Sequence, residues 1–197
     1  MTAYSGMWHN GVVLDTAQDA ITQGDLIVIP TDTVYGIAAD PFSSTAVDRL
    51  LVAKGRSLTM PPPILVADME QALSVAQVPG SLQALWPGAV TVIVKPIKKL
   101  GWEAETVAIR VPDWQSTRSL LYETGPLAVT SANITGMPPA TTIEMAQEYF
   151  GDSVAVYIDG GESPLGLAST IVDLTGVTPT LVRRGAVEWD DVMAALN

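Results

Sequence analysis

Short apolar runs rich in Val and Ile alternate with segments of helical spacing along most of this sequence. The runs are bounded by Gly, Pro, Asp or Ser, which is typical of strands buried in a sheet. In the segments between them, apolar residues recur every three or four positions, which indicates amphipathic helices. Neither kind of element can bury its apolar side alone, so this alternation restricts the chain to a sheet flanked by helices.

We predict the following strands: Leu26–Ile29, Ile64–Ala67, Val90–Val94, Thr106–Val111, Leu127–Thr130, Val154–Ile158, Ser169–Leu174 and Thr180–Arg183. The predicted helices are Asp15–Gln23, Ser44–Lys54, Asp68–Ala76, Ser81–Trp86, Ser116–Glu123, Thr142–Phe150 and Glu188–Leu196, and Ser44 is the predicted N-cap of the second. Some neighbouring strands are close enough for hairpins and others are joined by helices, so the sheet should be mixed. With 197 residues, 48% of them hydrophobic, and no long linker or repeat, we expect one α+β domain over residues 1–197.

The charge balance limits the possible partners. Acidic residues outnumber basic ones by 21 to 10, and the formal net charge is −11. A broad cationic face for duplex nucleic acid is therefore disfavoured, and we expect weak or no direct binding of nucleic acid. Positive charge is scarce, so its placement is informative. Four cations lie beside predicted strand ends, and we expect them to face one site: Lys54, Arg56, Arg110 and Arg183.

Several kinds of chemistry are excluded by what the chain lacks. Without cysteine there is no thiolate nucleophile, disulfide or thiolate zinc site, and His9 is the only histidine. The first ten residues lack the features of a signal peptide, and no apolar run approaches the ~20 residues of a membrane span. We therefore expect a cytoplasmic protein without a membrane segment. Neither a P-loop motif nor a Gly-x-Gly-x-x-Gly motif is present, so ATP would have to be bound in another way.

Small polar and cationic residues follow the strands at several points. In Pro30-Thr31-Asp32-Thr33-Val34-Tyr35-Gly36, the hydroxyls of Thr31 and Thr33 face the same way if the chain is extended, although a hydroxyl-closed turn is an alternative. Lys54-Gly55-Arg56 can neutralise a polyphosphate or form a solvated helix end at which Gly55 stops the helix.

Three further features resemble binding groups at strand ends. Ser131 and Asn133 emerge from an apolar strand and can bond phosphate or ribose oxygens, or else organise a turn. Arg110, inside an apolar strand, needs an anionic partner, which could be a ligand or an internal carboxylate. Ser169 opens one strand and Arg183 closes the last. Because ligands bind at the ends of strands in open α/β sheets, we interpret these features as a shared nucleotide site.

These residues, in this order, resemble the YrdC/TsaC family of threonylcarbamoyl-AMP synthases, and the resemblance extends from Gly24 to Gly185. It rests above all on the heptad Pro30–Gly36, the Lys-x-Arg at 54–56 and the Ser-x-Asn at 131–133. It implies an open, twisted mixed sheet flanked by helices, with a deep concave pocket. It also implies an enzyme that uses ATP, L-threonine and bicarbonate or carbon dioxide to make threonylcarbamoyl-AMP and pyrophosphate. The product would serve transferase proteins that modify the tRNA adenosine next to the anticodon.

The resemblance also implies a role for each matching residue. The phosphates and the carbamate would be bound by Lys54 and Arg56, which are the expected catalytic residues. The nucleotide would further be bound by Thr106, Ser131, Asn133 and Arg183. Threonine would be bound by Thr31, Thr33, Arg110 and Ser169. Mg²⁺ would be held mainly by the substrate phosphates, with no dedicated protein ligands.

Two places leave the comparison with the family open. Longer members often carry a histidine where this chain has Ala67, so threonine contacts from that side are undetermined. The stiff segment Pro61–Pro63 could be a lid or wall over a pocket, or simply a rigid edge loop. The alternative functions are an RNA-binding module, an inactive paralogue, and a carbamoyl-adenylate-forming module like that of hydrogenase-maturation proteins. Net charge argues against the first, the intact motifs against the second, and the absence of zinc-finger and acylphosphatase segments against the third.

Overall fold

The structure is a computed structural model that describes residues 2–5, 11–55 and 61–196. Its strands are β1 (Thr2–Ser5), β2 (Ile27–Ile29), β3 (Gly36–Ala39), β4 (Ile64–Leu65), β5 (Val90–Val94), β6 (Val107–Arg110), β7 (Leu127–Ser131), β8 (Val156–Asp159), β9 (Thr170–Asp173) and β10 (Thr180–Arg183). Its α-helices are α1 (Gly11–Thr22), α2 (Ser44–Ala53), α3 (Met69–Leu73), α4 (Gln115–Thr124), α5 (Ile143–Phe150) and α6 (Trp189–Leu196). Two 3₁₀ helices, η1 (Gly80–Ala84) and η2 (Gly151–Ser153), complete the described elements.

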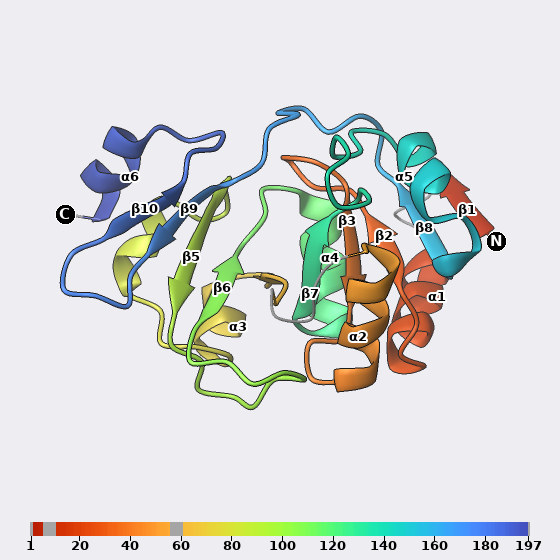
Figure 1. Cartoon of the computed structure of the whole chain (residues 1–197), viewed down its shortest axis with the longest axis horizontal. Coiled ribbons are helices and arrows are strands. Elements are labelled where there is room, and N and C mark those ends of the chain that lie inside the picture. Colours follow the sequence, from red (N-terminus) through yellow and green to blue (C-terminus); the bar gives the residue numbers. More distant parts are fainter. Residues whose placement is uncertain (1, 6–10, 56–60, 197) are drawn as a thin grey trace.

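All ten described strands belong to one sheet, in the order β1-β8-β2-β3-β7-β4-β6-β5-β9-β10. The sheet is mixed: β5 runs parallel to β9 and antiparallel to β6, and β2 runs parallel to β8 and antiparallel to β3. Figure 1 shows that β1 and β10 lie at opposite ends of this open sheet, with helices on both sides of it. Strands from both ends of the chain thus share one sheet.

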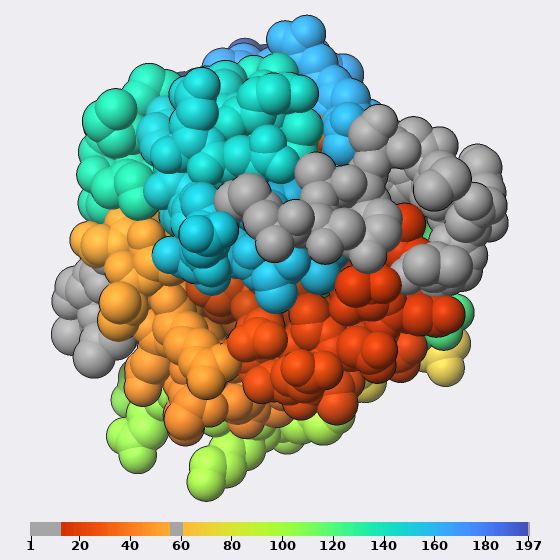
Figure 2. Space-filling model, turned by 90° about the vertical axis from the view of Figure 1, so that its right-hand side faces the viewer, coloured from red at the N-terminus to blue at the C-terminus, as the bar shows by residue number. Residues whose placement is uncertain are grey.

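One end of the sheet is enclosed on both faces. Ile27 and Ile29 of β2 join a core with α1 and α4, whereas Val28 between them joins a core with α2 and α5. Successive strand residues point to opposite faces, so a run of apolar residues serves both layers. Figure 2 shows this end of the molecule, with α1 (red), α2 (orange) and the α5–β8 segment (cyan) forming its outer surface.

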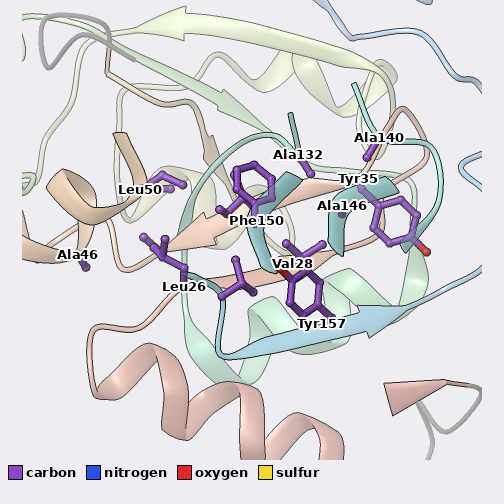
Figure 3. Packing of buried hydrophobic residues seen from close by; sticks show 14 of the residues in the cluster. Leu26, Val28, Tyr35, Ala46, Leu50, Ala132, Ala140, Ala146, Phe150 and Tyr157 are labelled. Atoms are coloured by element: carbon purple, nitrogen blue, oxygen red, sulfur yellow. The ribbon is translucent and has the colours of Figure 1, made fainter. Parts of the chain in front are cut away.

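The core beneath α2 and α5 contains two buried aromatic residues with polar tips. The rings of Tyr35 and Tyr157 are fully buried beside Leu26, Val28 and Phe150 (Figure 3). Both hydroxyls find backbone acceptors: Tyr157 donates to the carbonyl of Gly151 at 2.8 Å, and Tyr35 to that of Gly161 at 2.6 Å. Burial raises the pKa of Tyr157 to about 12 and raises that of Tyr35 further. The two side chains therefore fasten turns to the core while remaining neutral at physiological pH.

At the other end of the sheet, only one face carries this kind of core. Val92 of β5, Ile109 of β6 and Val172 of β9 pack together with apolar residues of α3, η1 and α6. The residues that alternate with these along each strand point to the opposite face, where the cavity described below is found. None of the described helices combines the length and the apolar character needed to cross a membrane.

Most predicted elements are present, and the differences have local causes. The eight predicted strands appear with shifts of up to two residues at their ends, and the segment predicted as a helix at Ser81–Trp86 is the 3₁₀ helix η1. The N-cap of α2 is Ser43 and not Ser44: the Ser43 hydroxyl accepts from the amide of Ala46 at 3.3 Å. Gly55 ends this helix as predicted, with a left-handed φ of +60°.

Two strands, β1 and β3, were not predicted. The sequence of β3 is Gly-Ile-Ala-Ala, which has low intrinsic strand propensity, yet all four residues are buried. Pairing on both sides, with β2 and with β7, makes this segment a strand. A substituent on Gly36 would collide with the side chain of Val129, so the glycine is needed for close packing at this point.

Candidate active site

A cavity of about 340 Å³ lies on the face of the sheet opposite the core formed with α3, η1 and α6. Five segments contribute pairs of lining residues two positions apart, as expected for one face of a sheet, and Thr130 and Ala168 line the cavity as well. These pairs are Pro63 and Leu65, Thr91 and Ile93, Ala108 and Arg110, Val129 and Ser131, and Ser169 and Ile171. The floor of this cavity is a sheet face and the loops that follow the strands form its walls, whereas the sequence predicts a site at the ends of the strands.

The loop between β2 and β3 forms one wall, and Thr31 closes it. The Thr31 hydroxyl donates to the carbonyl of Val34 at 2.6 Å and accepts from the amides of Thr33 and Val34. Because its proton is committed to Val34, the 2.9 Å contact with Thr33 must use the proton of Thr33. Thr31 is therefore a turn-closing residue, the alternative that the sequence left open, while both threonines also line the cavity.

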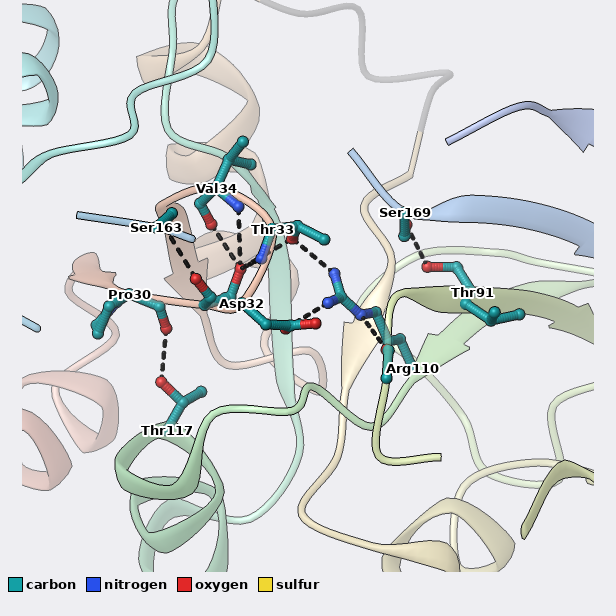
Figure 4. A network of polar contacts seen from close by, with 12 residues as sticks. Pro30, Asp32, Thr33, Val34, Thr91, Arg110, Thr117, Ser163 and Ser169 are labelled. Atoms are coloured by element: carbon teal, nitrogen blue, oxygen red, sulfur yellow. Dashed lines mark hydrogen bonds and ion pairs between the residues drawn. The ribbon is translucent and has the colours of Figure 1, made fainter. Parts of the chain in front are cut away.

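Arg110 is held by three groups from two other segments (Figure 4). It forms an ion pair with Asp32, donates from Nη1 to the Thr33 hydroxyl at 2.8 Å, and donates from Nε to the carbonyl of Gly88 at 2.8 Å. Burial lowers the pKa of Arg110, and the nearby Asp32 carboxylate acts in the opposite direction. The internal salt bridge is present, yet two of the five guanidinium hydrogens are not used by these contacts, and Arg110 lines the cavity.

The environment of Lys54 excludes the solvated helix end that the sequence left open as an alternative. Its side chain is only 3% exposed, and its ammonium group donates to the carbonyl of Ser131, to the carbonyl of Asn133 and to the Asn133 side-chain oxygen. The same Asn133 oxygen accepts from the Ser131 hydroxyl at 2.7 Å, and its amide nitrogen donates to the carbonyls of Ile134 and Met137. Lys54 and Asn133 therefore organise the turn that presents Ser131 to the cavity.

On the opposite side of the cavity, Arg183 holds Ser169. The Arg183 guanidinium donates twice to the Ser169 carbonyl, at 2.7 and 3.1 Å, and once to its hydroxyl at 3.2 Å. Partial burial lowers the pKa of Arg183. Arg49 pairs with Asp25 and Arg110 with Asp32, whereas the hydrogen bonds of Arg183 to described residues all go to Ser169. Arg183 therefore stands at the cavity as a cation without a carboxylate partner in the described part of the chain, and its charge adds to that of Arg110.

The structure brings six of the predicted site residues to the cavity lining: Thr31, Thr33, Arg110, Ser131, Ser169 and Arg183. Lys54 and Asn133 lie directly behind Ser131. Thr106 is exposed, precedes β6 and does not line the cavity. Arg56 lies outside the described residues, as does His9.

The structure also describes two positions that the sequence left open, the Pro61–Pro63 segment and Ala67. Pro61 and Pro63 line the cavity, so this segment is a wall of it. Ala67 is fully buried, and its backbone bonds to Gln71 and Arg118, so no contact with a ligand comes from its position.

Sequence reasoning assigned no role to two groups of this site, Asp32 and Thr91. Asp32 lies inside the heptad and supplies the counter-charge of Arg110. Thr91 is a buried hydroxyl in the otherwise apolar strand β5 and bonds to Ser169 at 2.7 Å. A lone polar residue in a buried strand is the signal that could have revealed it.

A larger hollow of about 950 Å³ lies elsewhere, between the start of α2 and the loop that joins β5 to β6. Its lining includes Phe42, Lys98 and Trp102, and the Lys98 ammonium lies 4.7 Å from the centre of the Phe42 ring. None of the predicted site residues lines it, so the smaller cavity, with its two guanidinium groups and its hydroxyls, is the candidate active site.

Comparison with known proteins agrees with this fold. The Sua5/YciO/YrdC family model, described as "Telomere recombination", matches residues 19–185. A protein of Mycobacterium tuberculosis, whose name provisionally assigns it as a threonylcarbamoyl-AMP synthase, is 44% identical over 191 residues, covering 92% of this chain and 88% of its own. A Pyrococcus abyssi protein named threonylcarbamoyl-AMP synthase is 34% identical, over 87% of this chain and 54% of its own.

Among solved structures, the chain resembles Sua5 of Pyrococcus abyssi complexed with L-threonine, with a TM-score of 0.88 and 30% sequence identity. The superposition covers 99% of this chain and 59% of the archaeal one. The chain therefore spans little more than half the length of the Pyrococcus abyssi proteins, whereas it matches most of the length of the mycobacterial relative.

Proposed function

The chain belongs to the Sua5/YciO/YrdC family, and from this premise we propose that it is an L-threonylcarbamoyladenylate synthase, a nucleotidyltransferase. The observation that supports this most directly is the pairing of Arg110 and Arg183 at one cavity in a chain of net charge −11. Two guanidinium groups surrounded by Ser and Thr hydroxyls suit substrates with several anionic oxygens.

The proposed reaction has two steps. The amine of L-threonine attacks carbon dioxide, supplied as bicarbonate, loses a proton and becomes a carbamate. A carbamate oxygen then attacks the α-phosphorus of ATP, the bond to the β-phosphate oxygen breaks, and pyrophosphate leaves with the electron pair. No side-chain nucleophile is required, so the protein contributes orientation of the reactants and positive charge against developing negative charge.

We assign the residues of the cavity to the two substrates. Thr33, Arg110 and Ser169 would bind L-threonine, since Arg110 keeps two hydrogens free beside its ion pair with Asp32. Ser131 and Arg183 would bind the nucleotide, together with Arg56. Lys54 and Asn133 would act there by shaping the turn at Ser131. Thr31 would act as a wall of the threonine site, and Thr106 would contact the nucleotide from its exposed position before β6.

Mg²⁺ is proposed to arrive with ATP and to be held by phosphate oxygens and water. No carboxylate is among the described residues that line the cavity, and within the described part of the chain no group of three or more potential metal ligands converges.

The product would pass to transferase proteins that act on tRNA in the cytoplasm. One domain over residues 1–197 would carry the synthase reaction.

The test is pyrophosphate release by the purified protein, with threonine and bicarbonate each omitted in turn and the nucleotide product identified by its mass. We expect release to require both, and the product to have the mass of threonylcarbamoyl-AMP. Release that is independent of threonine, or a product of another mass, would contradict the proposal.

Adjacent arginines provide a matched pair of variants. Arg183→Met removes a cavity cation without leaving a buried carboxylate unpaired, and should lower turnover by about 100-fold. Arg184→Met removes an exposed charge one position away, which does not line the cavity, and should leave turnover unchanged. Equal turnover of the two variants would exclude the assigned role of Arg183.

A further inference from the structure

Thr91 places a hydroxyl at the cavity that no part of the proposed reaction has yet used. Its neighbours Val90 and Val92 belong to the apolar core, and Thr91 points from β5 to the cavity face with 3% of its surface exposed. Of the described residues, only Ser169 is within hydrogen-bond distance of its hydroxyl, at 2.7 Å (Figure 4). β5 and β9 are parallel neighbours, so the contact joins two segments that the sheet holds in register.

Ser169 receives a second donor from the other side. Nη2 of Arg183 donates to the Ser169 hydroxyl oxygen at 3.2 Å, while Nη2 and Nε of the same guanidinium hold the Ser169 carbonyl. The cation can only donate, so the Ser169 oxygen must act as the acceptor in this contact. The backbone and the side chain of Ser169 are both fixed by Arg183.

The geometry allows two arrangements of the hydroxyl protons, because either hydroxyl can be the donor of the 2.7 Å contact. If Thr91 donates to Ser169, the Thr91 hydrogen is satisfied, and the Ser169 oxygen accepts from both Thr91 and Arg183. Its two lone pairs are then used, and its own hydrogen is free to point into the cavity as a donor. If Ser169 donated to Thr91 instead, the donor offered to the ligand would come from β5, and Ser169 would have no proton left for it.

We propose that Thr91 is a positioning residue that makes Ser169 a hydrogen-bond donor to an anionic oxygen of the amino-acid substrate. The charges of Arg110 and Arg183 draw such an oxygen to this end of the cavity, and each donor in the chain polarises the next. This inference rests on the proposed function, since it assumes that the substrate at Ser169 is L-threonine.

The test compares Thr91→Val with Thr91→Ser. Valine keeps the branched shape of threonine and suits a buried strand, but it lacks the hydroxyl; serine keeps the hydroxyl and lacks the methyl group. Loss of one hydrogen bond to a charged group corresponds to about a tenfold effect. We expect Thr91→Val to raise KM for L-threonine about tenfold, with a much smaller change in KM for ATP, and Thr91→Ser to restore most of the affinity.

Binding of L-threonine to the full chain, measured by calorimetry without ATP or bicarbonate, provides a readout that does not depend on turnover. Absence of synthase activity in the unmodified protein would refute the proposed function. The Thr91 inference fails separately, if Thr91→Val binds threonine as tightly as the unmodified protein. It also fails if Thr91→Ser is as weak as Thr91→Val, because the methyl group would then be the important part. Thr180→Val, the same substitution at an exposed position of β10, is the control and should bind normally.

A double-mutant cycle covers the case in which Thr91→Val folds poorly. Thr91→Ala also removes the hydroxyl, and if Thr91 acts only through Ser169, adding Thr91→Ala to Ser169→Ala should cause no further loss of threonine affinity beyond that of Ser169→Ala. Additive losses from the two sites would mean that Thr91 contacts the substrate itself, and they would overturn the positioning role.

Discussion

Lys54 illustrates at the scale of one residue how a group that is proposed to act at a binding site can have a structural role. Its ammonium group has three hydrogens, and oxygens of Ser131 and Asn133 accept hydrogen bonds from it. With 3% of its side chain exposed, it cannot be compared with a solvated lysine at a helix end. The position at the C-terminus of α2 still favours its charge, but the contacts that hold it come from residues 77 and 79 positions away.

We therefore predict that Lys54→Ala destabilises the protein as well as reducing synthase activity. The substitution leaves buried carbonyl oxygens without a hydrogen-bond donor. Each such unpaired group lowers the free energy of unfolding by about 1–3 kcal/mol. Urea unfolding should show a lower midpoint for Lys54→Ala than for Lys99→Ala, whose side chain is exposed. Equal midpoints for the two variants would show that Lys54 contributes only to binding.

At the scale of elements, the cavity depends on how closely the end of β10 approaches the start of β9. The amide of Gly185 donates to the Thr170 hydroxyl at 3.1 Å, and the amide of Ala186 to the carbonyl of Ala168 at 2.9 Å. A Cβ on Gly185 would collide with backbone atoms of Ala168 and Ser169. The glycine is thus required by a close approach of two backbones, and this approach fixes the position of Ser169.

Gly185→Ala should consequently displace Ser169 from Thr91 and Arg183. We expect an overpacking cost of about 1–3 kcal/mol in the free energy of unfolding and a rise in KM for L-threonine. Thermal unfolding and steady-state kinetics on the same preparation would measure both. Gly176→Ala, in the turn between β9 and β10, is the control, because a Cβ there has its nearest neighbour at an ordinary 3.7 Å. A Gly185→Ala variant with normal kinetics would argue against this coupling.

At the scale of the whole molecule, the net charge of −11 separates a small-molecule enzyme from an RNA-binding module. Affinity for RNA without sequence preference comes mainly from neutralised phosphates and declines with salt. Arg110 is paired with Asp32, and Arg183 is hydrogen-bonded to Ser169. The two cavity arginines therefore do not form a broad basic surface. The ten-stranded sheet instead concentrates the available positive charge at one cavity.

We predict that the protein binds tRNA more weakly than about 10⁻⁴ M at physiological salt, the weak limit of non-specific binding. Filter binding with a salt titration measures this. The exposed residues Lys98 and Lys99 provide the control: if weak binding is seen at low salt, Lys98→Glu with Lys99→Glu should abolish it. Tight binding that persists in this variant and falls steeply with salt would restore the RNA-binding alternative.

Individual strands and residues show how much of the structure can be predicted from the sequence. The strands that form the cavity floor were predicted because their periodicity is local, and β5 and β10 match to the residue. The strand β3 was missed because its residues favour no strand by themselves, and its two neighbours in the sheet decide its conformation. The hydroxyls and cations proposed for the site were predicted from the order of motifs, but Asp32 and Thr91 were not, because their partners are distant in the sequence.

The sequence by itself determined the class of fold, the family and the side chains available for binding, because apolar periodicity and motif order are properties of the chain alone. Only the tertiary structure decided that the site lies on a face of the sheet, and which of its donors remain free for a ligand. Arg110 and Asp32 are 78 positions apart, as are Thr91 and Ser169. Hydrogen bonds saturate, so the groups that a side chain can still offer depend on neighbours that only folding brings within reach.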